Sequence, residues 1–309
     1  MESISTTFSI LITTKNRIND LKFTLIKIQY LLHRNDVKCI ICDDGSTDGT
    51  ASFVKENYPQ IHLIQNVSSK GLIYSRNRLL NLVKTDYAIS LDDDAHFLSE
   101  NPLETIGKVF RENSKIAVLG FRIFWDLKEP ETILHSAVSH RMKSFVGCGH
   151  VWRMSAWRDI PKYPSWFVFY GEEDFASYQL FKKKWEIHYL PEVLIHHRVD
   201  VKARKNNTDY SFRLRHSMRS GWYLYFLFLP LSLIPKKMAY SIWMQLQLKV
   251  FKGDWKALKA LLFALIDLFL ALPKIINNKN RLTRAEYEAY QKLPETRLYW
   301  KPEKVYYES

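Results

Sequence analysis

The stretch Tyr87-Ala88-Ile89-Ser90-Leu91-Asp92-Asp93-Asp94 decides the expected fold, because a short uncharged run stops abruptly at three carboxylates. Such a run is typical of a buried parallel strand whose carboxyl end opens into a crevice. Ligands of open α/β sheets bind at that edge. Three adjacent carboxylates repel one another, so a compact fold needs a cation beside them, and oxygen ligands favour Mg²⁺ or Mn²⁺. An isolated acidic triplet is more often a solvated turn, so the surrounding sequence has to decide between the two interpretations.

Two earlier apolar runs also end in polar clusters. Residues 8–12 lead into one cluster, and residues 37–42 lead into another. The polar side chains that follow are Thr14, Asn16 and Arg17 after the first run and Asp43 and Asp44 after the second. Apolar residues between the two runs recur at helical spacing. The alternation predicts an α/β fold with a doubly wound, mostly parallel sheet whose ligand edge carries these polar groups.

The composition points to an anionic partner. The 309 residues carry a net charge of +13, which favours nucleic acid, an anionic membrane surface or phosphorylated substrates. The first apolar run is too short for a secretory signal and no basic region precedes it, so we expect the protein in the cytoplasm.

The three cysteines predict neither a disulfide framework nor a metal site. Cys39 and Cys42 have CxxC spacing, but positions i and i+3 of a strand face opposite sides of the sheet. Both are therefore expected to be ordinary buried side chains.

In their order and spacing, the polar segments resemble family 2 glycosyltransferases, which have the GT-A nucleotide-sugar fold. The matching segments are residues 14–17, 43–48, 70–77, 91–94, 171–174 and 191–197. The DDGSTDGT motif alone is moderately specific, and the later LDDD and GEED motifs make the combined signal strong. The resemblance covers roughly the first two-thirds of the chain.

The resemblance implies a binding site for a nucleotide-diphosphate sugar, UDP- or dTDP-linked. Asp43 or Asp44 would accept a hydrogen bond from a pyrimidine N–H. Arg76 would meet the diphosphate or orient the carboxylates, together with other basic groups. The donor-binding set implied in this way is Thr14, Asn16, Arg17, Asp43, Asp44, Lys70, Gly71, Arg76, Asp92 and Asp93.

A Mn²⁺ or Mg²⁺ site is also implied by the resemblance. Asp92 and Asp94 match the family's aspartate pair, with Asp94 expected to contact the metal directly and Asp92 to contact the ribose or act through water. His197, or its neighbour His196, stands where the family can carry a further metal or phosphate ligand. The metal would stabilise the leaving nucleoside diphosphate.

The acidic cluster Glu172-Glu173-Asp174 matches the family's catalytic acid pair. One carboxylate would act as general base on the acceptor hydroxyl, in a single displacement that inverts the anomeric centre. Counting back from Pro191 favours Glu173, with Asp174 second. Gln179 stands where the family often has Arg, which weakens this register. The Gln-x-x-Arg-Trp signature of processive synthases is missing, so we expect one sugar per encounter.

The composition changes near residue 201, which predicts a catalytic domain over residues 1–205 and a helical extension over residues 206–309. A basic stretch comes first, with Lys202, Arg204, Lys205, Arg213, Arg215 and Arg219. Residues 222–229 fall short of the roughly 20 apolar residues of a spanning helix. Residues 261–272 are interrupted by Asp267 and flanked by lysines, a pattern that favours an interfacial helix on an anionic, cytoplasmic membrane face. Ordinary packing against the catalytic domain is the alternative.

The leading hypothesis is thus a metal-dependent, inverting glycosyltransferase that acts on a glycan or lipid-linked acceptor in surface polysaccharide or glycolipid assembly. A nucleic-acid-binding protein would explain the charge, but the sequence carries no nucleic-acid-binding motif, so no nucleic acid is expected. A nucleotidyltransferase would normally carry a glycine-rich loop near its amino terminus, and residues 13–17 contain no glycine. A non-catalytic binding protein on the same fold is the remaining alternative, and the intact acidic clusters argue against it.

Overall fold

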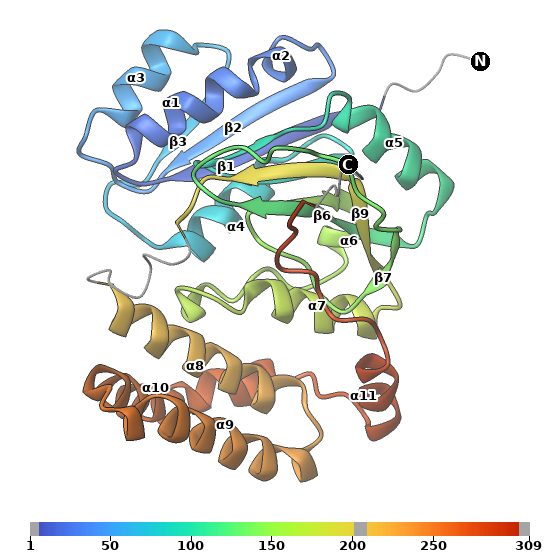
Figure 1. Cartoon of the computed structure of the whole chain (residues 1–309). Helices are drawn as coiled ribbons and strands as arrows, with labels where there is room; N and C mark the ends of the chain where they lie inside the picture. The colour runs from blue at the N-terminus through green and yellow to red at the C-terminus, as the bar shows by residue number, and fades with distance from the viewer. Residues whose placement is uncertain (1–5, 201–208, 303–309) are drawn as a thin grey trace, which may run out of the picture.

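A computed structural model describes residues 6–200 and 209–302, and one mixed sheet forms its centre (Figure 1). The strands are β1 (Phe8–Thr14), β2 (Val37–Asp43), β3 (His62–Gln65), β4 (Tyr87–Asp92), β5 (Ala95–Phe97), β6 (Ile116–Trp125), β7 (His140–Met142), β8 (Gly149–Arg153) and β9 (Glu186–His197). The helices are α1 (Ile18–Lys27), α2 (Gln29–Leu32), α3 (Thr50–Asn57), α4 (Leu72–Leu82), α5 (Pro102–Glu112), α6 (Met154–Arg158), α7 (Glu172–Lys182), α8 (Tyr210–Phe228), α9 (Ile234–Leu248), α10 (Trp255–Asn278) and α11 (Arg284–Gln291).

The strands lie in the order β3-β2-β1-β4-β8-β6-β9-β5, and β7 pairs with β9. The first four of these are parallel, β6 is parallel to β9, and β8 is antiparallel to both of its neighbours. Six strands (β1, β2, β3, β4, β6 and β9) therefore run one way, and β5, β7 and β8 run the other. The predicted α/β fold with a doubly wound, mostly parallel sheet is confirmed, with β8 inserted in the opposite direction near its centre.

Alternate side chains of the central strands pack into two cores, one on each face of the sheet. Ile10 and Ile12 join the core beneath α1, α2 and α5, whereas Leu11 joins the core beneath α4, α6 and α7. Cys39 and Cys42 are both buried and fall in different cores, which confirms the predicted orientation of the pair. Helices on both faces are what a strand with two apolar sides requires.

Strand register brings the polar clusters together at one edge of the sheet. Thr14 at the end of β1 lies beside Asp43 of β2, and Thr13 lies beside Asp92 of β4. The two acidic segments are far apart in the sequence, but parallel pairing places the ends of β2 and β4 at the same edge, on either side of the end of β1.

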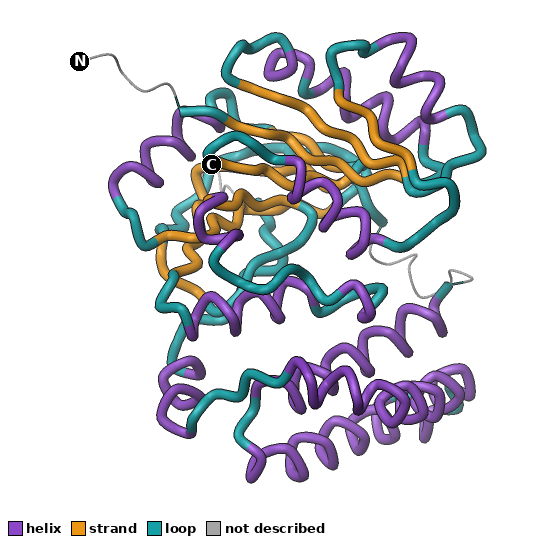
Figure 2. Tube along the Cα trace, turned by 180° about the vertical axis from the view of Figure 1, so that it is seen from behind, coloured by secondary structure: helices purple, strands orange, loops and turns teal. Residues whose placement is uncertain are grey.

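Helices α8, α9 and α10 form a further layer below α7, on the side away from the sheet (Figures 1 and 2). The core beneath α7 continues into this layer without a break. Phe228 of α8 packs against Phe175 and Tyr178 of α7, with ring centroids 5.3 and 4.8 Å apart. The predicted domain boundary after residue 205 lies outside the described residues, as does the first part of the basic stretch (Lys202, Arg204 and Lys205).

Asp267 does not interrupt α10, because its carboxylate faces α8 and is paired there. Arg215 Nη2 lies 2.5 Å from Asp267 Oδ1, and Arg219 Nη1 lies 3.1 Å from Asp267 Oδ2. The helix continues over 24 residues, and by length and composition it could cross a membrane. One side of α10 packs along α8 instead, so the pairing of Asp267 fixes which side of the helix faces outward.

Candidate functional site

A cleft of about 700 Å³ opens at the carboxyl ends of β1 and β4. The predicted site residues that line it are Thr14, Arg17, Asp44, Gly71, Asp92, Asp93, Asp94 and His197. The remaining predicted residues, which are Asn16, Asp43, Lys70, Arg76, Glu172, Glu173 and Asp174, lie outside this lining. Parallel strands thus bring most of the predicted donor and metal residues to one crevice, as open α/β sheets do.

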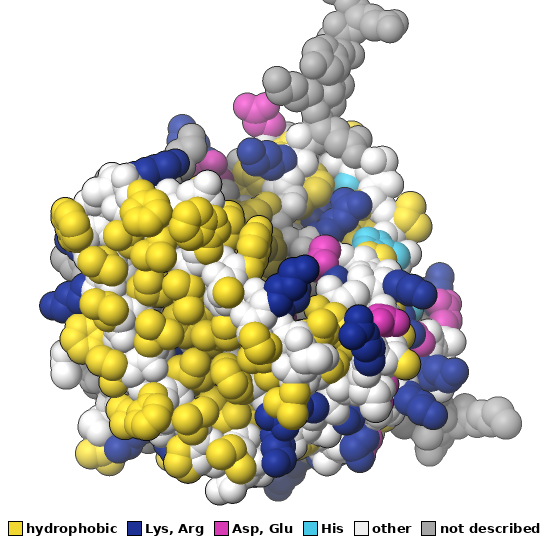
Figure 3. Space-filling model, turned by 90° about the horizontal axis from the view of Figure 1, so that it is seen from below, with side chains coloured by type: hydrophobic (Ala, Val, Ile, Leu, Met, Phe, Trp, Pro, Cys, Tyr) yellow, Lys and Arg dark blue, Asp and Glu magenta, His cyan; other side chains and the backbone are white. Residues whose placement is uncertain are grey.

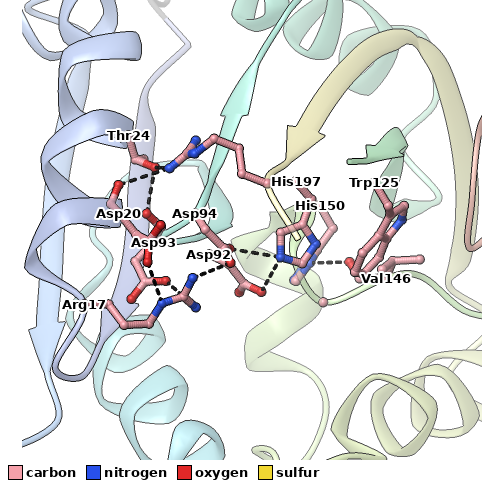
Figure 4. Close-up of polar contacts among 12 residues, drawn as sticks. Arg17, Asp20, Thr24, Asp92, Asp93, Asp94, Trp125, Val146, His150 and His197 are labelled. Carbon is pink, nitrogen blue, oxygen red and sulfur yellow. Dashed lines mark hydrogen bonds and ion pairs between the residues drawn. The ribbon is translucent and has the colours of Figure 1, made fainter. Parts of the chain in front are cut away.

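Asp92, Asp94 and His197 converge in the cleft (Figure 4). His197 Nε2 lies 2.9 Å from Asp94 Oδ1 and 3.9 Å from Asp92 Oδ2. One ligand atom from each residue lies within 4.8 Å of the others. Two carboxylates, from the end of β4 and the turn after it, and an imidazole from the end of β9 are a donor set that Mn²⁺ accepts, so these residues fit the predicted metal.

Arg17 compensates the acidic triplet from the loop after β1. Its Nη1 lies 3.1 Å from Asp93 Oδ1, and its Nη2 lies 2.6 Å from Asp94 Oδ2. Burial raises the pKa of Asp93 to about 8, and Arg17 offsets only part of that effect. Burial also acts on Asp94, but there the contacts with His197 and Arg17 outweigh it and hold the pKa below its usual range. The two neighbouring carboxylates therefore favour different protonation states.

Arg76 lies at the centre of a buried polar network beside the cleft, with 5% of its surface exposed. Its Nη2 lies 3.0 Å from Asp92 Oδ1, and its Nη1 lies 2.8 Å from Glu172 Oε1 and 3.1 Å from Glu173 Oε1. Nη2 also donates to the carbonyl of Gly147, at 3.0 Å. This position suits the orientation of carboxylates, which is the second of the two roles expected for Arg76.

The three acidic residues at the start of α7 have different surroundings. Glu172 is 1% exposed and held by Arg76, whereas the side chain of Glu173 is 20% exposed. Asp174 interacts with Ser144 instead. Burial raises the pKa of Glu173 to about 8, the charge of Glu172 adds to the shift, and Arg76 reduces it. Asp174 is exposed, but Glu173 combines partial exposure with a contact to Arg76 and a pKa near neutrality, which suits a general base.

Asp44 organises the loop on the donor side of the cleft. Its carboxylate accepts hydrogen bonds from Asn66 Nδ2, the Ser69 and Ser75 hydroxyls, and the backbone N–H groups of Lys70 and Gly71. Burial alone would raise the pKa of Asp44, but these donors lower it below its usual value. Asp43 is fully buried and accepts a hydrogen bond from the backbone of Ser46. Its Oδ2 has no hydrogen-bond partner among the residues that the structure describes.

Asn16 and Lys70 contribute to the site mainly through the loops that they hold. Asn16 adopts a left-handed conformation (φ 52°), and its Oδ1 accepts a hydrogen bond of 2.7 Å from the backbone of Thr47. This bond joins the loops after β1 and β2. The side chain of Lys70 is exposed, and its backbone N–H contributes to the Asp44 network.

Several residues with no predicted role also contribute to the site. Arg198 lines the cleft and donates its backbone N–H to the carbonyl oxygen of Asp94. Its position directly after His197 is the one sequence feature that could have indicated a role in the site. A Cβ on Gly147 would lie 2.0 Å from Glu173 Oε1, so any larger residue there would displace that carboxylate. Phe212 and Arg213 form a far wall of the cleft. No local sequence pattern distinguishes them from the rest of the basic stretch.

His196 does not share the site of His197, because adjacent strand residues face opposite sides of the sheet. It forms a second cluster with His96 and Glu129. In that cluster Arg198 donates to His96 Nδ1, so the proton of neutral His96 must lie on Nε2. A protonated Nε2 is a donor and not a ligand, and Lys27 already pairs with Glu129. This second cluster is therefore poorly suited to a metal.

Comparisons with known proteins bear on the family and the fold of this chain. The family model described as Glycosyl transferase family 2 matches residues 9–181. Among curated proteins, no sequence matches.

Two solved structures support the fold. A crystal structure of GalNAc-T7 with UDP, GalNAc and Mn²⁺ aligns with a TM-score of 0.55 and 14% identity, over 72% of this chain and 50% of that one. A mannosyltransferase, PcManGT from Pyrobaculum calidifontis, in complex with GDP-Man and Mn²⁺, aligns with a TM-score of 0.54 and 14% identity, over 92% of this chain and 83% of that one. The predicted GT-A fold is confirmed by these likenesses.

Proposed function

Because this chain belongs to glycosyl transferase family 2, we propose that it moves one sugar from a UDP- or dTDP-linked donor to a hydroxyl group of a glycan or lipid-linked acceptor. The acceptor would belong to surface polysaccharide or glycolipid assembly. The observation that carries the proposal is the network around Arg76. One guanidinium group holds Asp92 at the cleft and Glu173 beside it, so a donor-binding carboxylate and a candidate base are fixed relative to each other.

In this proposal the nucleotide lies along the loops that Asp44 organises. Thr14 and Gly71 line that part of the cleft, and Arg17 provides a cation next to the position of the diphosphate. GalNAc-T7 with UDP and PcManGT with GDP-Man, both with Mn²⁺, support a nucleotide donor and a divalent cation here. Asp92, Asp94 and His197 would hold Mn²⁺ or Mg²⁺, which when bound neutralises the diphosphate and stabilises it as a leaving group.

Glu173 would be the general base. It would take the proton of the acceptor hydroxyl while the acceptor oxygen forms a bond to the anomeric carbon of the sugar. The bond from that carbon to the diphosphate oxygen breaks on the opposite face, so the configuration inverts. Glu172 would hold Arg76 in place, and Asp174 would be the alternative base.

The helical extension would place the enzyme on the cytoplasmic face of a membrane. The outward surface of α9 and α10 is apolar, and lysines outnumber acids in these helices, which suits an anionic lipid surface. The catalytic half would then work as a peripheral membrane enzyme.

The test is release of nucleoside diphosphate from UDP-, dTDP- and GDP-sugars by the full chain. We expect turnover of one donor with Mn²⁺ and a loss of about 100-fold or more with EDTA or in Asp94→Ala. Glu112→Ala, an exposed acid on α5, is the matched control and should behave as the unaltered enzyme. Full activity of Asp94→Ala, or no binding of any of these donors, would rule the proposal out.

A further inference from the structure

Helices α9 and α10 expose a broad apolar surface, which we call the apolar face (Figure 3). Its exposed large side chains are Leu231, Tyr240, Trp243, Leu248, Phe251, Trp255, Leu262, Phe263, Ile266, Phe269, Leu270 and Ile276. Monomeric proteins seldom leave so many neighbouring apolar side chains in water unless the surface binds something.

The charges around the apolar face are almost all positive. Residues 231–280 contain eight lysines, no arginine and two acids, Asp254 and Asp267. Both acids are engaged inside the molecule, Asp267 with the arginines of α8 and Asp254 with Tyr210 and the start of α10. Lysines flanking aromatic and aliphatic groups are complementary to an anionic bilayer, because each lysine is attracted to the anionic headgroups.

The cleft reaches the border of the apolar face through the first turn of α8. Phe212 and Arg213 line the cleft, and their neighbours contact α10. Tyr210 donates its hydroxyl to Asp254 Oδ2 at 2.7 Å, and Ser211 donates to the carbonyl of Lys256 at 3.5 Å. Trp255 lies between these two contacts and is 72% exposed. One turn of helix therefore separates the cleft wall from the apolar face.

We infer that the acceptor is a lipid-anchored molecule, held in the bilayer that the apolar face contacts, and that its hydroxyl-bearing head enters the cleft beside Phe212. This inference rests on the proposed function and selects one of its two acceptor classes. A soluble glycan would need no such border between the cleft and an apolar surface. Without this border, a lipid-anchored acceptor would have to leave the bilayer to reach the cleft.

The experiment compares two acceptor preparations from the source cells in one assay with a radiolabelled donor. One is a lipid extract in vesicles of phosphatidylglycerol and phosphatidylcholine, and the other is the water-soluble glycan fraction. The full chain is compared with Leu262→Glu and Phe269→Glu on the apolar face, and with Ile26→Glu on α1 as the matched control. These residues are 53%, 72% and 63% exposed.

We expect label in the organic phase with the vesicles and little in the soluble glycan. Leu262→Glu and Phe269→Glu should each lower this transfer, and binding in vesicle flotation, by about ten-fold or more. Their donor hydrolysis in water should equal that of Ile26→Glu, which shows that the cleft is intact.

Label in the soluble glycan alone would overturn the inference while leaving the proposed function standing. So would unchanged vesicle transfer by both α10 variants. A dimer in gel filtration that Leu262→Glu dissociates, without flotation of the unaltered chain, would assign the apolar face to a second copy. Absence of donor hydrolysis in every preparation would instead reject the proposed function.

Discussion

The side chain of Arg76 fixes the relative positions of several acidic side chains. Its guanidinium group contacts three carboxylates and a carbonyl, which come from three separate segments of the chain. Burial of an arginine is costly unless its donors are satisfied, and here four contacts satisfy them. The position of Glu173 relative to Asp92 therefore depends on a residue that does not line the cleft.

The pH dependence of sugar transfer should follow the ionisation of the Glu173 carboxylate. Since burial raises its pKa to about 8, the carboxylate is largely protonated below that pH and cannot accept a proton. We expect kcat/KM for transfer to rise with pH and to level off above about 8. Glu173→Gln should abolish the rise and most of the activity, whereas Asp174→Asn should keep both. The opposite result for the two variants would assign the base to Asp174.

Gly147 leaves the space in which Glu173 and Arg76 meet. A Cβ there would lie 2.0 Å from Glu173 Oε1 and 2.7 Å from Arg76 Nη1, so Gly147→Ala must displace the proposed base or its partner. We expect a fall in kcat of about 100-fold, because small misplacements of reacting groups are costly. Gly221→Ala is the control, since a Cβ on that α8 residue meets no atom within 4 Å. It should keep activity and gain about 0.5–1 kcal/mol of stability. Equal activity of both variants would contradict this role of Gly147.

At the scale of elements, the ion cluster between α8 and α10 fixes how the two helices pack. Asp267 is 9% exposed and its carboxylate meets Arg215 and Arg219, while the Tyr223 hydroxyl donates to its backbone carbonyl. Removing one member of a buried pair leaves the other charge uncompensated. The orientation of α10, and with it the composition of the apolar face, depends on this cluster.

Asp267→Asn should lower the free energy of unfolding by about 3 kcal/mol at neutral pH, measured by denaturant titration. Burial alone would raise the pKa of Asp267, but the hydrogen bonds from Arg215 and Arg219 lower it below its usual value. A lowered folded-state pKa stabilises the protein above the unfolded value of about 4 and loses that effect as pH falls through the folded value. The two proteins should therefore converge in stability at acidic pH. A difference that persists unchanged there would exclude the ion cluster as its cause.

At the scale of the whole molecule, the charge of +13 should govern approach to a membrane. Attraction between lysines and anionic headgroups is screened within about 10 Å at 0.1 M salt. Flotation of the full chain with phosphatidylglycerol vesicles should weaken several-fold between about 0.05 and 0.5 M salt. Binding to pure phosphatidylcholine should be weaker and nearly independent of salt. Salt-independent binding to both kinds of vesicle would show that apolar contact alone holds the protein at the membrane.

The sequence by itself determined the parallel part of the sheet and the polar edge of the cleft. Strand runs that end in polar residues place those residues at one edge whenever the strands are parallel, so Thr14, Asp44, Asp92 and Asp94 could be assigned from local pattern. The opposite orientations of Cys39 and Cys42 follow from the same two-residue period. His197 could be named because the resemblance supplied its position.

Only the tertiary structure decided which side chains meet across the chain. Contacts such as Arg76 with Glu173, or Asp267 with Arg215, join residues whose separation in sequence carries no periodic signal. The direction of β8 and the space that Gly147 leaves for Glu173 depend on packing that local propensity does not encode. An acid in an apolar run looks like an interruption until its partner is known. The partner lies on another helix, and that is why the apolar face of α10 could be defined only after the chain was folded.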